Sequence, residues 1–519
     1  MQRRKLPIGI QTFREIREEG CYYVDKTPYA IRLIEQGKHY FLSRPRRFGK
    51  SLFLDTLAEL FSGNRALFEG LYAEAHWDWS VRYPVIRISF AAGRLETREA
   101  LEAHIAAELE GNAQRLGVML ADAADSHLRF RALIQAAVAR HGQRAVVLID
   151  EYDKPILDNL GDKAVAAAMR EGLRNLYSVL KDQDAHLLFV LLTVVSKLSN
   201  VSIFSGLNNH NDITLEARYS AICGYTDEDI DTVFAPELEG LDREEIRRWY
   251  NGYGWLGERV YNPFALLLLF DKRSYRAWWF ETGTPTFLIE LLKERHTFTP
   301  KLDTLVADDQ LLGAFDVEYI ATEAILWQTG YLTIVDVESA GGITEYRLGY
   351  PNREVESAFN TALLRAWVPQ APMPLALYKK FAALDFDALK THFESLYASI
   401  PADWYRNNPI TQYEGYWASV FYSHIASLGL DLTPEDVTNQ GRIDLTLKLD
   451  AAIVVIEFKR IAGKEPTGEA IAQLKARGYA DKYRADGRPV YLLGVEFSAE
   501  RRNVVGWDVV KDGSGNPMH

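Results

Sequence analysis

The segment at residues 44–51, Arg-Pro-Arg-Arg-Phe-Gly-Lys-Ser, constrains the fold of this chain more than any other. A short apolar run at residues 39–42 precedes it and predicts a strand, and apolar residues at helical spacing up to Phe61 follow it. Gly63 is well placed to end that helix. Strand, loop, Gly-Lys-Ser and helix match most of the pattern G-x-x-x-x-G-K-[ST] of phosphate-binding loops. The segment therefore predicts an α/β domain that holds phosphate at the end of its first strand.

The chemistry of such a loop follows from its geometry. Backbone N–H groups and the positive end of the helix would face the phosphates. Lys50 would neutralise the β and γ oxygens, and the Ser51 hydroxyl would ligate Mg²⁺. The residues expected to bind the nucleotide are Arg46, Arg47, Phe48, Gly49, Lys50 and Ser51. Arg44 replaces the first glycine of the pattern, which leaves ATP hydrolysis, as opposed to binding, open. An ordinary basic strand-to-helix turn is the alternative.

A second motif favours nucleotide binding. The apolar run at residues 145–149 predicts a strand of a parallel sheet that is buried on both faces. Asp150 and Glu151 follow it, at the end of the strand where such sheets bind ligands. Asp150 would hold Mg²⁺, directly or through a water, and Glu151 would polarise the attacking water. A strand that ends in a solvated acidic turn is the alternative.

Two more strands are predicted, at residues 85–90 and 186–192. A strand inserted between the phosphate loop and the acidic strand, with a Glu beside the Asp, resembles the AAA-type branch of P-loop ATPases. The resemblance implies that Thr193, at the end of the following strand, senses the γ-phosphate. A plain structural role at the end of a core strand is the alternative for Thr193.

Length and composition bound the rest of the chain. At 519 residues, two to three domains are expected. No apolar run approaches the roughly 18 residues that cross a bilayer, so no membrane partner is expected. Cys21 and Cys223 lack metal-ligand spacing, which is typical of a reducing, cytoplasmic setting. The net charge of −12 disfavours broad non-specific binding to nucleic acid, although Arg44 and its neighbours up to Lys50 form a local positive patch.

Three parts are expected along the chain. Residues 1–225 carry the alternating strands and helices, and residues 226–375 are expected to be mostly helical. Three prolines between residues 369 and 374 mark a linker, and residues 376–512 form the third part.

The third part contains a second constellation of charged residues. A strand with Asp444 and a strand with Glu457 and Lys459 would be joined by a tight turn at residues 448–450, which brings the two carboxylates side by side. Asp444, Glu457 and the backbone carbonyl of Phe458 would ligate Mg²⁺. Lys459 would orient or help deprotonate the attacking water and stabilise charge on a phosphodiester. A solvated, salt-bridged hairpin face is the alternative.

The flanks of this constellation add further candidates. Glu414 begins a helical pattern and would add a carboxylate, and Gln473 and Tyr479 are expected on the helix after the acidic strand. Another strand is predicted at residues 490–495. The order αβββαβ resembles the core of the PD-(D/E)XK nucleases, with Asp444 and Glu457-x-Lys459 as the diagnostic residues.

The chain as a whole is similar to the bacterial family of AAA-ATPase-like proteins fused to a C-terminal PD-(D/E)XK nuclease domain. The segments that carry this resemblance are residues 23–27, 44–51, 149–155, 196–209 and 441–444. In that family Arg is common at the position of Arg44. The resemblance implies an α/β chain with a P-loop, AAA-type parallel-sheet domain at 1–225, a mostly helical lid or linker at 226–375, and a restriction-endonuclease-like domain at 376–512.

Two functions are compatible with these patterns. The first is a nuclease that binds ATP and Mg²⁺ and is regulated by ATP, with DNA more probable than RNA as its substrate. The second is a nucleotide-controlled switch or scaffold whose nuclease-like domain binds nucleic acid without cutting it. Assembly into a homo-oligomer is open, because AAA-type ATPases often take an arginine from a neighbouring subunit. Strandedness, sequence specificity and that arginine are not indicated by the sequence.

Overall fold

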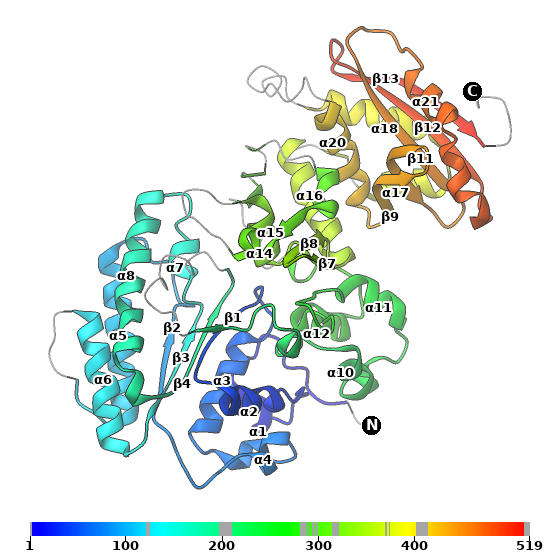
Figure 1. The fold of residues 1–519 in the computed structure, drawn as a ribbon. Helices are drawn as coiled ribbons and strands as arrows, with labels where there is room; N and C mark the ends of the chain where they lie inside the picture. The colour runs from blue at the N-terminus through cyan, green and yellow to red at the C-terminus, as the bar shows by residue number, and fades with distance from the viewer. Residues whose placement is uncertain are drawn as a thin grey trace. The chain divides into compact units, whose positions relative to one another are not determined.

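The computed structural model of the chain (Figure 1) describes residues 3–120, 125–196, 210–280, 288–289, 291–292, 295, 299–313, 321–368, 371–372, 374–400 and 414–512. The chain divides into two compact units. The first comprises Met1–Trp279 with Val306–Asn352, and the second comprises Phe280–Leu305 with Arg353–His519.

The first unit is built around a five-stranded parallel sheet. Its strands are β1 (His39–Ser43), β2 (Val85–Ser89), β3 (Ala145–Asp150), β4 (Leu187–Val194) and β5 (Asn211–Asp212). They lie in the order β2-β3-β4-β1-β5, and every pairing is parallel. The near-continuous apolar sequences of β1, β3 and β4 are buried, as expected for a sheet covered on both faces. The parallel sheet predicted from the sequence is confirmed.

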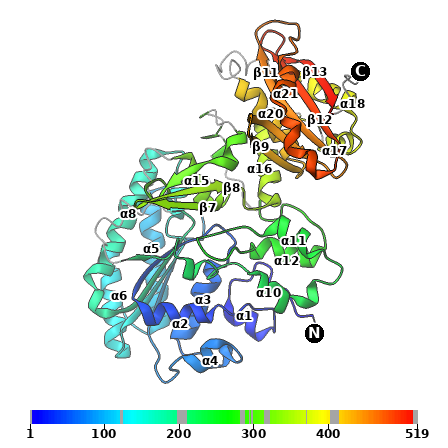
Figure 2. The same ribbon diagram turned by 45° about the vertical axis from the view of Figure 1, so that its right-hand side comes forward.

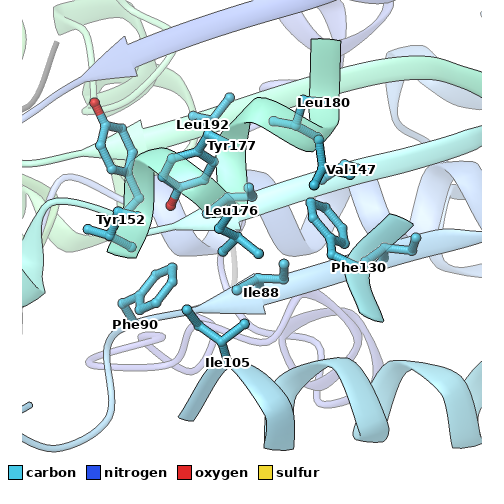
Figure 3. Packing of buried hydrophobic residues seen from close by; sticks show 14 of the residues in the cluster. Ile88, Phe90, Ile105, Phe130, Val147, Tyr152, Leu176, Tyr177, Leu180 and Leu192 are labelled. Atoms are coloured by element: carbon cyan, nitrogen blue, oxygen red, sulfur yellow. The ribbon is translucent and has the colours of Figure 1, made fainter. Parts of the chain in front are cut away.

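Helices cover this sheet (Figure 1). The helices α5 (Arg98–Leu116), α6 (Ser126–His141) and α8 (Lys163–Asp182) pack on one face, and α3 (Lys50–Phe61) lies on the other. Figure 3 shows the apolar core between Phe130 and Leu176 of the helices and Ile88 and Val147 of the strands. The remaining helices of this region are α1 (Phe13–Glu18), α2 (Thr27–Gln36), α4 (Tyr72–His76) and α7 (Lys154–Leu157).

The strand β2 lies at one edge of the sheet, where its outer backbone groups would otherwise be unpaired. Asn112 of α5 accepts a hydrogen bond from the Arg87 N–H at 2.7 Å and donates one to the Arg87 carbonyl at 2.6 Å. The Glu108 carboxylate accepts from the Ser89 N–H at 3.1 Å. Side chains of one helix therefore make the bonds that a neighbouring strand would make.

The middle of the chain begins with three helices, α10 (Asp227–Thr232), α11 (Arg243–Tyr250) and α12 (Pro263–Lys272). Thr226 and Asp229 form a capping box at the start of α10. The helices α14 (Asp309–Gly313) and α15 (Thr322–Thr329) follow. The structure adds a small antiparallel sheet in the order β6-β8-β7, made of β6 (Val306–Asp308), β7 (Thr333–Ala340) and β8 (Ile343–Gly349). Figure 2 shows β7 and β8 beside α15.

The second unit contains a five-stranded mixed sheet. Its strands are β9 (Asp431–Thr438), β10 (Gly441–Lys448), β11 (Ile453–Ile461), β12 (Val490–Ser498) and β13 (Asn503–Lys511), in the order β13-β12-β11-β10-β9. Only β11 and β12 pair in parallel. The described residues of this unit form the helices α16 (Arg353–Trp367), α17 (Pro374–Ala382), α18 (Phe386–Ala398), α20 (Glu414–Ala426) and α21 (Glu469–Arg477). The predicted αβββαβ order runs from α20 to β12.

Both faces of the mixed sheet are covered by helices. Val455 of β11 packs with Leu474 of α21, and Phe458 packs with Phe421 of α20 at a ring distance of 5.0 Å. Because neighbouring residues of a strand point to opposite faces, Glu457 shares a face with Val455 and therefore faces α21. The local sequence thus decides on which side of the sheet the candidate carboxylate lies.

Candidate functional sites

The phosphate loop connects β1 to α3 in a strained conformation. Gly49 precedes the first turn of α3 with φ at 91°, and Arg47 has φ at 67°. Lys50 is buried, and its amine donates hydrogen bonds to the carbonyls of Arg44 at 2.9 Å and Pro45 at 3.0 Å. The loop is therefore wrapped around the lysine amine, and the first turn of α3 starts beside it.

Arg44 has a different environment from the other basic residues of the loop. It is 0% exposed, and its guanidinium donates hydrogen bonds to the carbonyls of Ser43, Thr214 and Tyr219 at 2.8, 3.1 and 2.8 Å. It also stacks on Trp255 at 4.0 Å. Burial lowers its pKa to about 10, which still leaves it charged at neutral pH. The expected positive patch therefore does not include Arg44.

Arg46 and Arg47 are exposed on the same loop. The Arg47 guanidinium lies over the Phe264 ring at 4.7 Å. The Arg46 carbonyl accepts a hydrogen bond from the Trp279 indole at 2.9 Å. Of the basic loop side chains, these two and not Arg44 are available to a ligand at the surface.

Aromatic residues hold the loop from behind. Phe48 is buried against Tyr253 and Trp255, at ring distances of 4.7 and 5.6 Å. Gly330 also packs closely against the loop, because a Cβ at this position would come within 2.6 Å of the Pro45 ring. Phe48, expected from the sequence at the nucleotide, is therefore a core residue by its side chain, and only its backbone can face a ligand.

The acidic strand ends close to the start of α3. The Thr193 hydroxyl donates a hydrogen bond to the Asp150 carboxylate at 2.6 Å, across neighbouring strands β3 and β4. Asp150 and Ser51 line the same cleft. Glu151 follows in a left-handed conformation with φ at 51°, a strained state that is common at functional sites. The structure therefore brings Ser51, Asp150 and Thr193 into one region.

Asp153 belongs to this region, although the sequence patterns did not single it out. Its fully buried carboxylate accepts hydrogen bonds from the N–H groups of Val195 and Ser196 at 3.2 and 2.7 Å and from the Ser196 hydroxyl at 3.1 Å. Burial raises its pKa to about 6. Asp153 ties the turn after β3 to the end of β4. The motif that continues at residues 197–209 lies outside the described residues.

The second site lies where β10 and β11 part. The paired residues nearest to it are Leu445 and Ile456, so Asp444 and Glu457 are the next residues along the two strands. One Asp444 oxygen accepts a hydrogen bond from the Phe458 N–H at 2.8 Å. The Lys459 amine lies 3.3 Å from the Glu457 carboxylate. The hairpin predicted from the sequence, with its turn after Lys448, brings these residues together.

The pKa of Glu457 is strongly perturbed. The residue is 1% exposed, and burial together with the neighbouring Asp444 charge raises its pKa to about 7. One of its oxygens accepts from Lys459 and from the Gln473 amide, and the other is buried without a hydrogen-bond partner among the described residues. A buried carboxylate oxygen that lacks a partner is costly, and a bound cation would satisfy it.

Two further residues hold α21 in place at this site. The Glu496 carboxylate accepts hydrogen bonds from the Thr467 N–H at 2.6 Å and the Ala470 N–H at 3.3 Å, at the start of the helix. A Cβ on Gly494 would lie 2.6 Å from the Ile471 nitrogen. The helix therefore rests directly on β12, and this close packing positions Gln473 over Glu457.

Glu414 and Tyr479 were also expected near this site, and the structure places them differently. Glu414 begins α20, as predicted, but its side chain is outside the described residues. Tyr479 lies beyond α21, which ends at Arg477, and its hydroxyl donates to the Arg442 carbonyl at 3.0 Å. Tyr479 therefore supports β10.

Within the described residues, no group of three or more His, Cys, Asp and Glu side chains is arranged to hold a metal ion. Asp444 and Glu457 are accordingly a two-carboxylate set, to which a backbone carbonyl would have to be added. No helix in the described part of the chain is long and apolar enough to cross a membrane.

Comparison with known proteins assigns two stretches of the chain to known families. Residues 7–204 match the family described as "Predicted AAA-ATPase", and residues 412–507 match the "PD-(D/E)XK nuclease superfamily". The chain belongs to the family of AAA-ATPase-like proteins that carry a C-terminal PD-(D/E)XK nuclease superfamily domain. It is 58% identical over 514 residues to the "Uncharacterized protein in vnfD 5'region" of Azotobacter chroococcum mcd 1, covering 98% of this chain and 99% of that protein. No solved structure matches the chain.

Proposed function

We propose that this protein is a metal-dependent nuclease that acts on DNA and is regulated by ATP. The observation that carries the proposal is the buried Glu457 oxygen without a partner, next to Asp444 and within reach of Lys459. A buried carboxylate oxygen without a hydrogen-bond partner, beside a second carboxylate, fits a divalent cation.

In the nuclease site, Asp444, Glu457 and the Phe458 carbonyl would hold Mg²⁺. The bound cation would polarise the scissile phosphodiester and lower the pKa of a bound water. Lys459 would orient the attacking water and stabilise negative charge on the phosphorus oxygens. Gln473 would keep Glu457 in place, because its amide already donates to the Glu457 carboxylate.

In the nucleotide site, Lys50 would move from the loop carbonyls to the phosphate oxygens. Ser51 and Asp150 would hold Mg²⁺, Thr193 would sense the γ-phosphate through its bond to Asp150, and Glu151 would polarise the attacking water. Arg46, Arg47 and the backbone from Phe48 to Gly49 would complete the site. Arg44 has a structural role in this scheme, because its guanidinium is already bonded to three carbonyls.

The test is cleavage of plasmid, linear and single-stranded DNA and of RNA by the full-length protein, with Mg²⁺ or Mn²⁺ and with or without ATP. We expect Glu457→Ala and Lys459→Ala to abolish cleavage and to leave nucleotide binding intact. Lys50→Ala should remove nucleotide binding and the ATP dependence. Lys464→Ala and Glu500→Ala are matched controls, because this ion pair in the same unit is more than half exposed. Cleavage by Glu457→Ala would refute the site.

A nucleotide-controlled switch or scaffold is the second candidate function. The observation that favours it is the set of only two described carboxylates at the nuclease-like site. This function predicts nucleotide binding and a change in oligomeric state with ATP, without cleavage of any substrate in the panel. Size-exclusion chromatography with and without ATP, on wild type and Lys50→Ala, separates the two functions.

A further inference from the structure

A cleft of about 430 Å³ begins at the nucleotide site and extends along the edge of the parallel sheet. It lies between α3, β2 and α5. Ser51 and Asp150 line it near the carboxyl ends of the strands. Arg87 of β2 and Arg115 of α5 line it closer to the amino end of β2. Ser89 pairs with Asp150 in register, so Arg87 is two residues, or about 7 Å, further from the carboxyl end of the sheet.

Arg87 is held in position within this cleft. Its guanidinium bonds to one oxygen of the buried Asp55 at 2.6 Å, and the other Asp55 oxygen accepts from the Phe13 N–H at 2.7 Å. Asp55 is one helical turn after Ser51 on α3. A guanidinium has five N–H donors, and the Arg87 side chain is 43% exposed, so the ion pair with Asp55 orients it without enclosing it.

A second guanidinium stands beside the first. Arg115 of α5 donates to the Val85 carbonyl at 3.3 Å and to the Asn112 amide oxygen at 2.5 Å. Its pKa is lowered by burial and by the positive charge of Arg87. The two positive charges repel each other in this half-buried cleft. An anion bound between or beside them would reduce this repulsion and accept hydrogen bonds from both guanidinium groups.

We propose that this cleft is a separate phosphate-binding site, in which Arg87 and Arg115 bind inorganic phosphate beside Ser51 and Asp150. The inference rests on the proposed nucleotide function, because the site adjoins the position of the terminal phosphate. Phosphate from solution and phosphate released from a nucleotide are chemically the same ligand, and both would occupy it. Three carboxylates also line the cleft: Asp55 is paired with Arg87, Glu108 accepts a hydrogen bond from the Ser89 N–H, and Asp150 accepts one from Thr193.

The experiment is isothermal titration of the full-length protein, saturated with Mg-ADP, with potassium phosphate at constant ionic strength. ADP occupies the Lys50 loop but leaves the γ-phosphate position open, so the Arg87→Gln variant is what assigns phosphate binding to the cleft. We expect saturable binding in the millimolar range for wild type and at least about tenfold weaker binding for Arg87→Gln, with ADP affinity unchanged within about twofold. Absence of saturable binding in wild type, or wild-type affinity in Arg87→Gln, would overturn the proposal.

A second pair of variants guards against misfolding of Arg87→Gln. Gly111 of α5 lines the cleft, and a Cβ there would meet nothing within 4 Å. Gly111→Glu should therefore place a carboxylate in the cleft without a clash and weaken phosphate binding, whereas Gly111→Gln, of the same size without the charge, should bind more tightly than Gly111→Glu. Equal affinities in the two variants would contradict an anion site.

Failure of the nucleotide site is distinguishable from failure of the cleft. If wild type does not bind Mg-ADP, the proposed nucleotide function fails, and phosphate is then titrated into Lys50→Ala without ADP. Binding that persists in Lys50→Ala and is lost in the Lys50→Ala, Arg87→Gln double variant supports the cleft. Equal binding by these two variants overturns it.

Discussion

Replacement of Arg44 by alanine is predicted to destabilise the first unit strongly, although Arg44 stands where phosphate loops usually carry the smallest residue. The substitution leaves three backbone carbonyls without their donor, and each lost bond costs about 1 kcal/mol. Loss of the contact with Trp255, at 4.0 Å, adds about 1–2 kcal/mol in a desolvated setting. Part of this loss is recovered, because a buried cation no longer has to be desolvated. We expect the free energy of unfolding to fall by about 3–4 kcal/mol.

The matched control for this prediction is Arg46→Ala. Arg46 is exposed, and the bond from Trp279 goes to its backbone carbonyl, which alanine retains. We expect this variant to differ from wild type by less than about 0.5 kcal/mol. The assay is urea unfolding followed by tryptophan fluorescence, because Trp255 and Trp279 both pack at the loop. Equal stability of Arg44→Ala and Arg46→Ala would refute the argument that buried Arg44 holds the loop.

Three further results are expected. The pKa of Glu457 is raised from 4.5 to about 7, so the folded protein binds more protons than the unfolded one between these values and loses stability as the pH rises through this window. Thermal unfolding in EDTA should therefore show Glu457→Gln more stable than wild type at pH 8, with a smaller difference at pH 5; the reverse order would contradict the raised pKa. Apparent Mn²⁺ affinity of wild type, followed by calorimetry, should rise between pH 6 and 8 as Glu457 ionises, and a flat profile would count against Glu457 as a ligand. Gly494→Ala should displace α21 at Ile471, move Gln473 and reduce cleavage at least about tenfold, whereas Gly463→Ala, with open space around it, should not; equal activities would refute the positioning argument.

The parallel sheet could be predicted because β1, β3 and β4 are short, mostly apolar runs bounded by turns. The apolar runs in β10, β11 and β12 could be predicted for the same reason, with Glu457 and Lys459 two residues apart at the end of one of them, whereas β9 has no apolar run of its own. Asp150 was expected near a ligand because parallel sheets bind ligands at the carboxyl ends of their strands, whereas Thr193 was implied by the resemblance to AAA-type ATPases. In these cases local sequence determines both the element and the direction of its side chains.

The environment of Arg44 could not be predicted, because it depends on carbonyls 170 and 175 residues further along the chain and on Trp255. Burial of Phe48 has the same cause. The strand β6 has three residues, and it is stabilised by β8 rather than by its own sequence. Asp153 was missed because its carboxylate binds backbone N–H groups at residues 195 and 196, a contact with no sequence pattern of its own.

The side chains of α5 that bond to the outer edge of β2 limit the addition of a further strand to the sheet at this edge. An uncovered edge strand offers a template on which a second polypeptide can add itself, in assembly or in aggregation. The Asn112 side chain already bonds to both the N–H and the carbonyl of Arg87. An incoming strand would therefore have to break these two hydrogen bonds before it could pair with β2. Growth of the sheet is therefore blocked on this side by the side chains of a single helix.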